Sequence, residues 1–234
     1  MLTPSPFFRL ELESGRLVDK FPRTDAKSKA PWNNISQYCE ENLDVDIPSL
    51  IGIYILWFRN KQGWVKPIYI GRTKKQTLRK ESLSIRNCKI FNEHLEDHLL
   101  DEYKSGGKFY LSFLYNKSPR YRKGKLVKPD RREIEACETD FIHYASMVNE
   151  NLLNKMQGRK LEYTIDQHPA TGGWDGEKDR AIMGPAKALS EGLGIPWTHS
   201  KSGTRLLRDR WPTSPYSPRE NVLGRYRASL FVDW

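Results

Sequence analysis

Two tyrosines that stand beside glycines are the side chains whose spacing first suggests chemistry. Residues 52–54 read Gly-Ile-Tyr and residues 69–71 read Tyr-Ile-Gly, within two apolar runs that flank a polar turn. Runs of this kind predict the two strands of a hairpin. Strand alternation and pairing across the hairpin let Tyr54 and Tyr69 lie opposite or diagonal to each other. They are therefore either core aromatics or two phenols directed into one site.

A carboxylate on an apolar helix face is the second candidate. The pattern predicts a helix over residues 133–149 whose apolar stripe is Ile134, Phe141, Ile142, Ala145 and Val148. Glu138 lies on this stripe, four residues after Ile134 and four before Ile142. A carboxylate in that position must find a metal ion or a hydrogen-bonding partner. Glu135 is the weaker choice.

The order of these features resembles that of the GIY-YIG nuclease family. After the two tripeptides comes Arg79, at the spacing from Tyr69 that is typical of compact members. Glu138 then opens "ETDFI", and Asn154 closes "LLN". The resemblance covers roughly residues 50–155. It implies an α/β (α+β) fold, with a small antiparallel-rich sheet flanked by helices.

The resemblance also implies a reaction, the Mg²⁺-dependent hydrolysis of DNA phosphodiester bonds, in which Mn²⁺ could substitute. Glu138 would hold the single metal ion, because Mg²⁺ takes few protein carboxylates and fills its shell with water and phosphate oxygens. The donor fork of Arg79 suits the non-bridging phosphate oxygens. Tyr54 is the implied general base or water-orienting group, and Tyr69 and Asn154 complete the catalytic set.

The phenol of Tyr54 needs tuning for this role. An unperturbed tyrosine has a pKa near 10, and a neighbouring cation would lower the pKa by favouring the phenolate. Arg72, Lys74 and Tyr69 are the candidate neighbours of Tyr54. We therefore expect the site to depress the pKa of this phenol.

The chain departs from the family pattern at one functional position. Many members place a histidine or a tyrosine one helical turn after the catalytic arginine, where this chain has Leu83. Arg86, His94 or His98 could substitute from elsewhere. Arg86 is also a rival to Arg79 for the arginine role.

Which asparagine matches the family pattern at the end of the core is also undecided. The segment that follows Glu138 is longer than in compact members, so Asn149 or Asn151 could match the family's asparagine in place of Asn154. We divide the chain into an N-terminal extension packed on the core, a nuclease core, and a C-terminal extension that could recognise DNA. Their ranges are 1–49, 50–160 and 161–234.

The remaining patterns predict further elements. They are a strand and turn over residues 7–18, a short helix over 33–43, a helix over 90–103, a strand over 108–115 and a short strand near 229–234. Pro67 indicates an edge strand or the start of a strand. In the C-terminal third, residues 185–211 resemble a helix-turn-helix outline, although ordinary helices that brace the core fit the same pattern.

The charge of the chain favours a nucleic-acid partner. Lys and Arg number 39 against 29 Asp and Glu, which gives a net charge of +10, and strongly basic proteins commonly bind polyanions. The alternative is a charge excess that only aids solubility. The basic segment 117–132 predicts a loop or long hairpin. The predicted nucleic-acid contacts are Arg72, Lys74, Lys75, Arg86, Arg122, Lys123, Lys125, Lys201 and Arg205.

Composition and length narrow the protein class. No apolar run approaches the roughly 18 residues that span a bilayer, and the N-terminus lacks the pattern of a secretory signal. Three cysteines without a Cys-x-x-Cys pair suit a reducing compartment and argue against a zinc module. Among the branches of the family that the sequence resembles, a compact, restriction-endonuclease-like enzyme fits this length best. The resemblance thus implies a cytoplasmic enzyme that forms a homodimer or higher homo-oligomer to cut both strands of double-stranded DNA. The alternatives are a homing, mobile-element or repair nuclease, and a DNA-binding module without catalysis.

Overall fold

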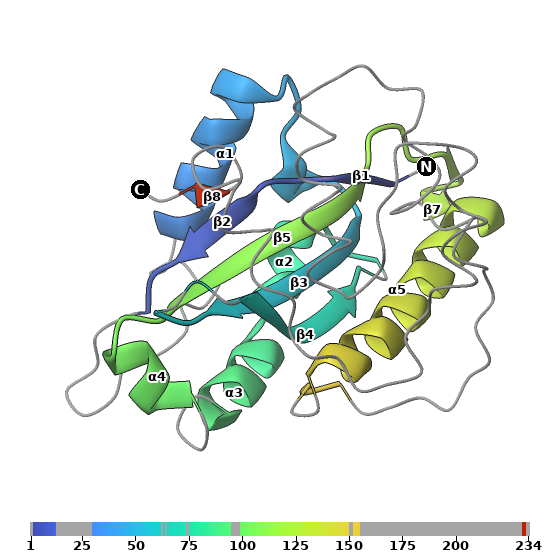
Figure 1. The fold of residues 1–234 in the computed structure, drawn as a ribbon. Coiled ribbons are helices and arrows are strands. Elements are labelled where there is room, and N and C mark those ends of the chain that lie inside the picture. Colours follow the sequence, from blue (N-terminus) through green and yellow to red (C-terminus); the bar gives the residue numbers. More distant parts are fainter. Residues whose placement is uncertain are drawn as a thin grey trace, which may run out of the picture.

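A six-stranded, largely antiparallel sheet with helices against both faces makes up the α+β fold (Figure 1). The computed structural model describes residues 2–12, 30–61, 63, 65–73, 75–94, 99–149, 152–154 and 231–232. The mixed class and the antiparallel sheet that the sequence predicts are confirmed within these residues. The statements below concern this part of the chain.

The sheet has the strand order β4-β3-β5-β2-β8, and β1 also pairs with β5. Its strands are β1 (Leu2–Pro4), β2 (Phe7–Leu10), β3 (Gly52–Arg59), β4 (Val65–Arg72), β5 (Lys108–Asn116) and β8 (Phe231–Val232). Only the pairing of β2 with β8 is parallel. The predicted hairpin strands and the short C-terminal strand are confirmed. Pro67 lies in β4, which forms an edge of this described sheet, as a proline in a strand predicts.

The helices predicted within the described residues are present with shifted boundaries. The helices of this part of the chain are α1 (Ala30–Asn42), the 3-10 turn η1 (Ile47–Ser49), α2 (Leu78–Ser82), α3 (Ile85–His94), α4 (Leu100–Lys104) and α5 (Lys128–Val148). Of these, η1 and α2 are additional to the predicted helices. The single helix expected over 90–103 is divided between α3 and α4, and residues 95–98 lie outside the described residues. None of the described helices is long and apolar enough to cross a membrane.

The early start of α5 has a local cause. The sequence pattern placed the beginning of this helix at residue 133, whereas α5 begins at Lys128. Pro129 stands in its first turn, where the missing N–H would have no partner inside the helix in any case. The basic first turn of α5 is therefore helical rather than part of a loop.

Alternate residues of β3 are buried on the two faces of the sheet, which explains its nearly continuous apolar sequence. Ile53, Ile55 and Trp57 belong to the core that α5 covers. Tyr54, Leu56 and Phe58 belong to the core that α1, α2 and α3 cover. The two layers fix both helix groups relative to one strand.

The pairing of β3 with β5 requires a glycine at the start of the first tripeptide. A Cβ atom on Gly52 would lie 1.9 Å from the carbonyl oxygen of Leu114. No side chain larger than hydrogen fits at that distance, so the close approach of the two strands depends on this residue.

On the far side of β5, β1 and β2 join the same sheet, so the N-terminal segment contributes strands to it.

Candidate active site at the edge of the sheet

The phenol of Tyr54 lies across Gly71. The two residues are cross-strand partners in β3 and β4. A Cβ atom at position 71 would lie 2.3 Å from both Cζ and the hydroxyl oxygen of Tyr54. Only a glycine lets this ring cover the backbone of β4. Because β4 is an edge strand of the described sheet, the buried hydroxyl of Tyr54 is carried toward that edge.

Tyr69 joins Tyr54 from the next position along the same face. It pairs with Leu56, which places it diagonal to Tyr54, as the hairpin pattern predicts. The two rings stack with centroids 6.2 Å apart and planes 30° apart. The other side of Tyr69 meets Phe91 of α3 edge-on, with a centroid distance of 5.2 Å. The two tyrosines are thus one aromatic pair held between β4 and α3.

Asn87, a residue that the sequence analysis missed, makes the direct hydrogen bond to Tyr54. Its Nδ2 donates to the Tyr54 hydroxyl oxygen at 2.7 Å. The same nitrogen also donates to the backbone oxygens of Glu81 at 2.9 Å and Ser82 at 3.3 Å, which fixes the amide. Asn87 stands four residues after Leu83, the position where the family pattern left a vacancy. That spacing is the signal that could have found it.

The expected depression of the Tyr54 pKa is wrong for the protein's own groups. Burial raises the pKa of Tyr54 most, and the charges of Tyr69, Glu81 and Glu138 raise it further. Among the causes, only the hydrogen bond from Asn87 lowers it. Among the described residues, no cation acts on this phenol, whose surroundings are buried and largely acidic. The sequence does not show which face of the sheet each side chain takes, so it could not predict these surroundings.

The pKa of Tyr69 is also raised, by burial first and then by the charge of Glu138. Here a cation acts in the opposite direction, since the guanidinium of Arg86 lowers the pKa. Arg79 lies exposed on α2 and is not among the groups that act on either phenol. Of the two rival arginines, Arg86 is therefore the one whose charge reaches the tyrosine pair.

Arg72 links the edge strand to two glutamates of α5. Its Nη1 lies 2.7 Å from Oε1 of Glu135, and its Nε lies 2.7 Å from Oε2 of Glu138. The Nε–H is buried and makes no aligned hydrogen bond, so the second contact is an ion pair only. Arg72 pairs across the hairpin with Ile53, which faces α5. The partner that Glu138 was expected to need is thus Arg72, a residue predicted to contact nucleic acid.

Glu138 contacts Arg72 and also influences the two phenols through its charge. Its side chain is 21 % exposed, against 44 % for Glu135. It reaches Arg72 on the α5 face, and its charge acts on Tyr54 and Tyr69 from the other face. Glu138 and Arg72 therefore lie on the α5 face of the sheet, and the two phenols lie on the opposite face, beside the same edge strand.

The side chain of Asn154 forms hydrogen bonds with the backbone of the edge strand β4. Its Oδ1 accepts from the Ile70 N–H at 2.8 Å, and its Nδ2 donates to the Ile70 oxygen at 2.6 Å. The rival Asn149 donates to the oxygen of Pro67 at 2.6 Å. Both amides therefore take the place of a further strand and hold β4, with Tyr69, Gly71 and Arg72, in position.

We expect Asn154→Ala to weaken the fold rather than the chemistry. Two backbone groups of Ile70 would lose their partners, at a cost of about 1–3 kcal/mol in the free energy of unfolding. Urea denaturation measures this, with Asn33→Ala at an exposed position of α1 as the matched control. The two variants could instead have equal unfolding midpoints while only Asn154→Ala loses most of its cleavage. That result would indicate that this amide contacts the substrate.

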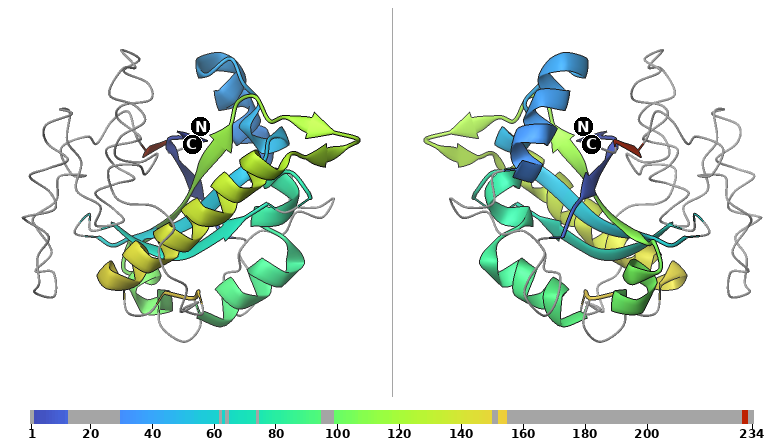
Figure 2. Two further views of the ribbon diagram at one scale, coloured as in Figure 1. Left: turned by 90° about the vertical axis from the view of Figure 1, so that its right-hand side faces the viewer. Right: turned by 90° about the vertical axis from the view of Figure 1, so that its left-hand side faces the viewer.

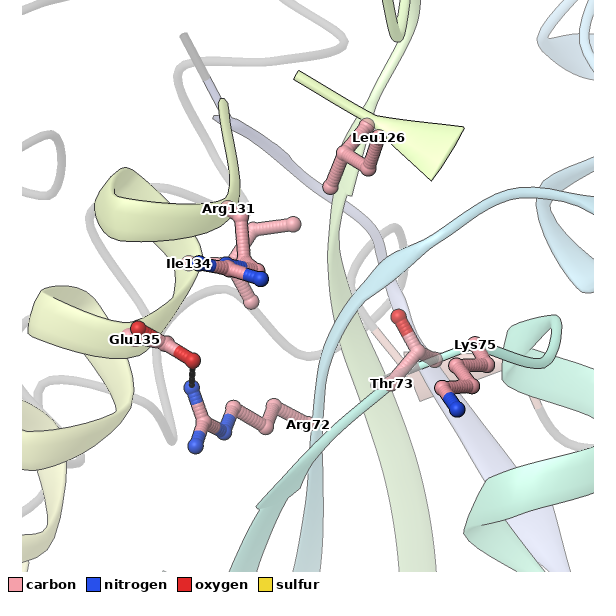
Figure 3. Close-up of a pocket in the computed structure, with 7 residues that line it drawn as sticks. All are labelled: Arg72, Thr73, Lys75, Leu126, Arg131, Ile134 and Glu135. Carbon is pink, nitrogen blue, oxygen red and sulfur yellow. Dashed lines mark ion pairs between the residues drawn. The ribbon is translucent and has the colours of Figure 1, made fainter. Parts of the chain in front are cut away.

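A cation-lined pocket of about 200 Å³ adjoins the Arg72 bridge (Figure 3). It lies between the end of β4 and the first turns of α5, and its lining residues are Arg72, Thr73, Lys75, Leu126, Arg131, Ile134 and Glu135. Glu135 is the only acidic residue among the described residues that line the pocket, and it pairs with Arg72. Lys75 and Arg131 are exposed, so the pocket can receive an anion such as a phosphate group.

The other predicted contacts divide into two groups. Arg122, Lys123 and Lys125 are exposed on a short hairpin that leads into α5. Lys74, Lys201 and Arg205 lie outside the described residues, as do Asn151, His98 and the helix-turn-helix outline over 185–211. His94 ends α3. Among the described residues, no group of three or more His, Cys, Asp or Glu side chains could hold a metal ion.

Comparison with known proteins adds no relative. No family model matches the chain, and no curated protein or solved structure matches it.

Proposed function

We propose that the chain is a Mg²⁺-dependent DNA endonuclease of the GIY-YIG type, most like a sequence-specific restriction enzyme. The observation that carries the proposal is the stacked pair of Tyr54 and Tyr69 at the edge strand β4, where Tyr54 lies across Gly71, together with Glu138, whose charge raises the pKa of both phenols. A Cβ atom at position 52 or 71 would clash with a neighbouring group, which explains why each tripeptide contains a glycine. The strand pair β3–β4 carries the two phenols, and α5 carries the carboxylate that the proposed hydrolysis needs.

The carboxylates fit a single hard cation. Glu138 and Glu135 lie on one face of α5 and both reach the same guanidinium, so their oxygens converge. Mg²⁺ is commonly held by one or two carboxylates together with substrate phosphate oxygens. Glu138 would be its ligand, and the ion would neutralise charge that develops on the phosphate. Arg72 would then lose its contact with Glu138 and keep its ion pair with Glu135.

The protein's own side chains supply proton handling and charge. Tyr54 holds its oxygen in a fixed place through Asn87, and as a phenolate it would accept a proton from the attacking water. Such a positioned group typically contributes about 10²–10⁴-fold in rate. Arg86, which acts on Tyr69, and the exposed Arg79 are the two guanidiniums available to the scissile phosphate. Lys75 and Arg131 would hold a flanking phosphate in the adjoining pocket.

Digestion of plasmid DNA tests the proposal. With Mg²⁺ we expect discrete fragments, because a restriction-like enzyme cuts at defined sequences, and end sequencing would map them. Chelation of the metal by EDTA should stop the reaction, and Mn²⁺ should restore it. Since one chain offers one site, cutting of both strands is expected to require two copies. A random smear would count against the restriction assignment and favour a non-specific nuclease.

One observation favours a second candidate, a DNA-binding module without catalysis. Arg72 already neutralises both carboxylates, so the site could be closed to metal. In that case plasmids and oligonucleotides of varied sequence would remain intact with Mg²⁺ or Mn²⁺, while the protein still retarded them in gels. That pair of results would replace the nuclease assignment.

A further inference from the structure

A two-stranded hairpin stands apart from the central sheet. Strands β6 (Tyr121–Arg122) and β7 (Lys125–Leu126) pair with each other and form a separate sheet. Figure 2 shows this hairpin projecting from the body of the described fold, beyond the beginning of α5. Every residue from 120 to 125 is exposed. Apart from Leu126 at its base, which packs against the core, the hairpin is directed to solvent, which suggests a role in binding.

The hairpin is preformed. Its two-residue turn, Lys123 and Gly124, has φ values of 51° and 71°, and a type I′ turn requires positive values at both positions. At the base, the N–H of Val127 donates to the oxygen of Arg120 at 2.9 Å. A ligand of this arm would therefore meet an ordered surface and would not have to order it.

A buried carboxylate anchors the base. Asp130 is 4 % exposed and accepts the backbone N–H of Arg120 at 2.9 Å and its Nε–H at 3.1 Å. These hydrogen bonds lower the pKa of Asp130, so the carboxylate stays ionised at neutral pH. Asp130 belongs to the first turn of α5, so the arm is tied to the helix that carries Glu138.

The surface of the arm is cationic, with one exposed aromatic ring. No acidic residue occurs from 117 to 129. Arg122 and Lys125 are direct cross-strand partners, and like charges opposite each other destabilise a hairpin. Tyr121 is 55 % exposed and is the one large exposed hydrophobic side chain among the described residues. A polyanion would relieve the repulsion, and a nucleic acid would in addition offer Tyr121 apolar surface.

The arm is continuous with the candidate site. Leu126 at the end of β7 and Arg131 in α5 line the cationic pocket, whose other wall includes Arg72 at the end of β4. A strand of DNA that fills this pocket beside Glu138 would therefore run toward the arm.

We infer that the β6–β7 hairpin is an arm that enters the major groove of double-stranded DNA next to the proposed cleavage site, an inference that rests on the proposed function. The major groove of B-form DNA, about 12 Å wide, admits a two-stranded ribbon. The major groove of an RNA duplex is too narrow for one. In this arrangement Arg122 and Lys125 contact the phosphates on either side of the groove. The turn at Lys123 reaches the edges of the bases.

The double variant Arg122→Gln, Lys125→Gln tests the arm in the full chain, without divalent metal so that binding is read alone. Its dissociation constant for a DNA duplex should rise about tenfold, and the dependence of log K on log salt should flatten by about 2. The matched control is Lys61→Gln, Lys104→Gln, which removes the same charge from exposed positions elsewhere. It should change neither quantity by more than about half as much.

The groove is tested with the probe DNA itself. Glucosylated 5-hydroxymethylcytosine fills the major groove and should weaken binding of the wild type more than that of the double variant. Netropsin, which fills the minor groove, should leave the difference between the two proteins unchanged. Equal binding by the double variant and the control, sensitivity to netropsin alone, or equally tight binding of an RNA duplex would each overturn the inference. DNA binding with the expected pattern but without any cleavage would refute the proposed function, and the inference about the DNA-binding arm would still hold.

Discussion

Replacing Glu138 by glutamine is expected to lower the rate of DNA cleavage by about 10²–10³-fold. The substitution keeps the shape of the side chain and removes its charge, so the oxygen that faces the β4 edge no longer suits a hard cation. Single-turnover cleavage of a duplex that the wild type cuts measures the loss. DNA binding, followed separately by fluorescence anisotropy, should change little, because the cations that hold phosphates are untouched.

Glu135→Gln is the matched control for Glu138→Gln. Both glutamates contact Arg72 from α5, so each variant loses one ion pair with the same guanidinium. Glu135 is the more exposed of the two and is not among the groups that act on the phenols. Its variant should therefore retain cleavage within about tenfold of wild type. The reverse order of effects would move the metal ligand to Glu135, and equal small effects would make the bridge purely structural.

Local patterns were sufficient to predict the elements of this site. The two tripeptides indicated the strands β3 and β4, and the apolar stripe around Glu138 indicated α5. These features depend on residues close in sequence, so the periods of strand and helix were enough to find them. The positions of the N-terminal strands in the sheet could not be found this way, because their partner β5 lies about a hundred residues further along the chain.

The partners within the site depended on which face of the sheet each side chain takes. Arg72 was predicted to contact nucleic acid, yet its pairing with Ile53 turns it to α5 and to Glu138. Asn87 was missed because its contact with Tyr54 joins residues 33 positions apart through the turn between α2 and α3. Asn154 was named from the order of features alone, and its position on the backbone of Ile70 gives it a role in holding β4.

Replacing Tyr54 by phenylalanine should separate chemistry from folding more sharply than any other substitution in the chain. The ring would still cover Gly71 and stack on Tyr69, since only one oxygen is removed. Asn87 would keep the backbone oxygens of Glu81 and Ser82 as acceptors, so no buried donor is left unpaired. We expect the unfolding free energy to change by less than about 1 kcal/mol. Cleavage should fall by about 10²–10⁴-fold if this oxygen handles the proton.

The pH dependence of cleavage tests whether Tyr54 acts as a phenolate. Burial and the charges of Tyr69, Glu81 and Glu138 raise its pKa, so the ionised form is scarce at neutral pH. The rate of the wild type should therefore climb with pH, about tenfold per unit, through the range in which circular dichroism shows an intact fold. The Tyr54→Phe variant should lose this dependence. A wild-type rate that is level between pH 7 and about 9.5 would remove Tyr54 from the base role.

Removal of the Glu81 charge tests the phenolate from the opposite direction, since this charge raises the pKa of Tyr54 and also that of Tyr69. Glu81→Gln removes a negative charge that raises the pKa of the Tyr54 phenol and leaves the backbone oxygen that Asn87 contacts. The phenolate becomes more accessible, so the rise in rate should move to lower pH and cleavage at pH 7 should increase. A substitution that merely damaged the site would lower the rate at every pH. A rise in rate that moves to lower pH in Glu81→Gln, and that disappears when Tyr54→Phe is added, would support proton transfer to the Tyr54 oxygen; an increase that is equal at every pH would instead indicate tighter DNA binding.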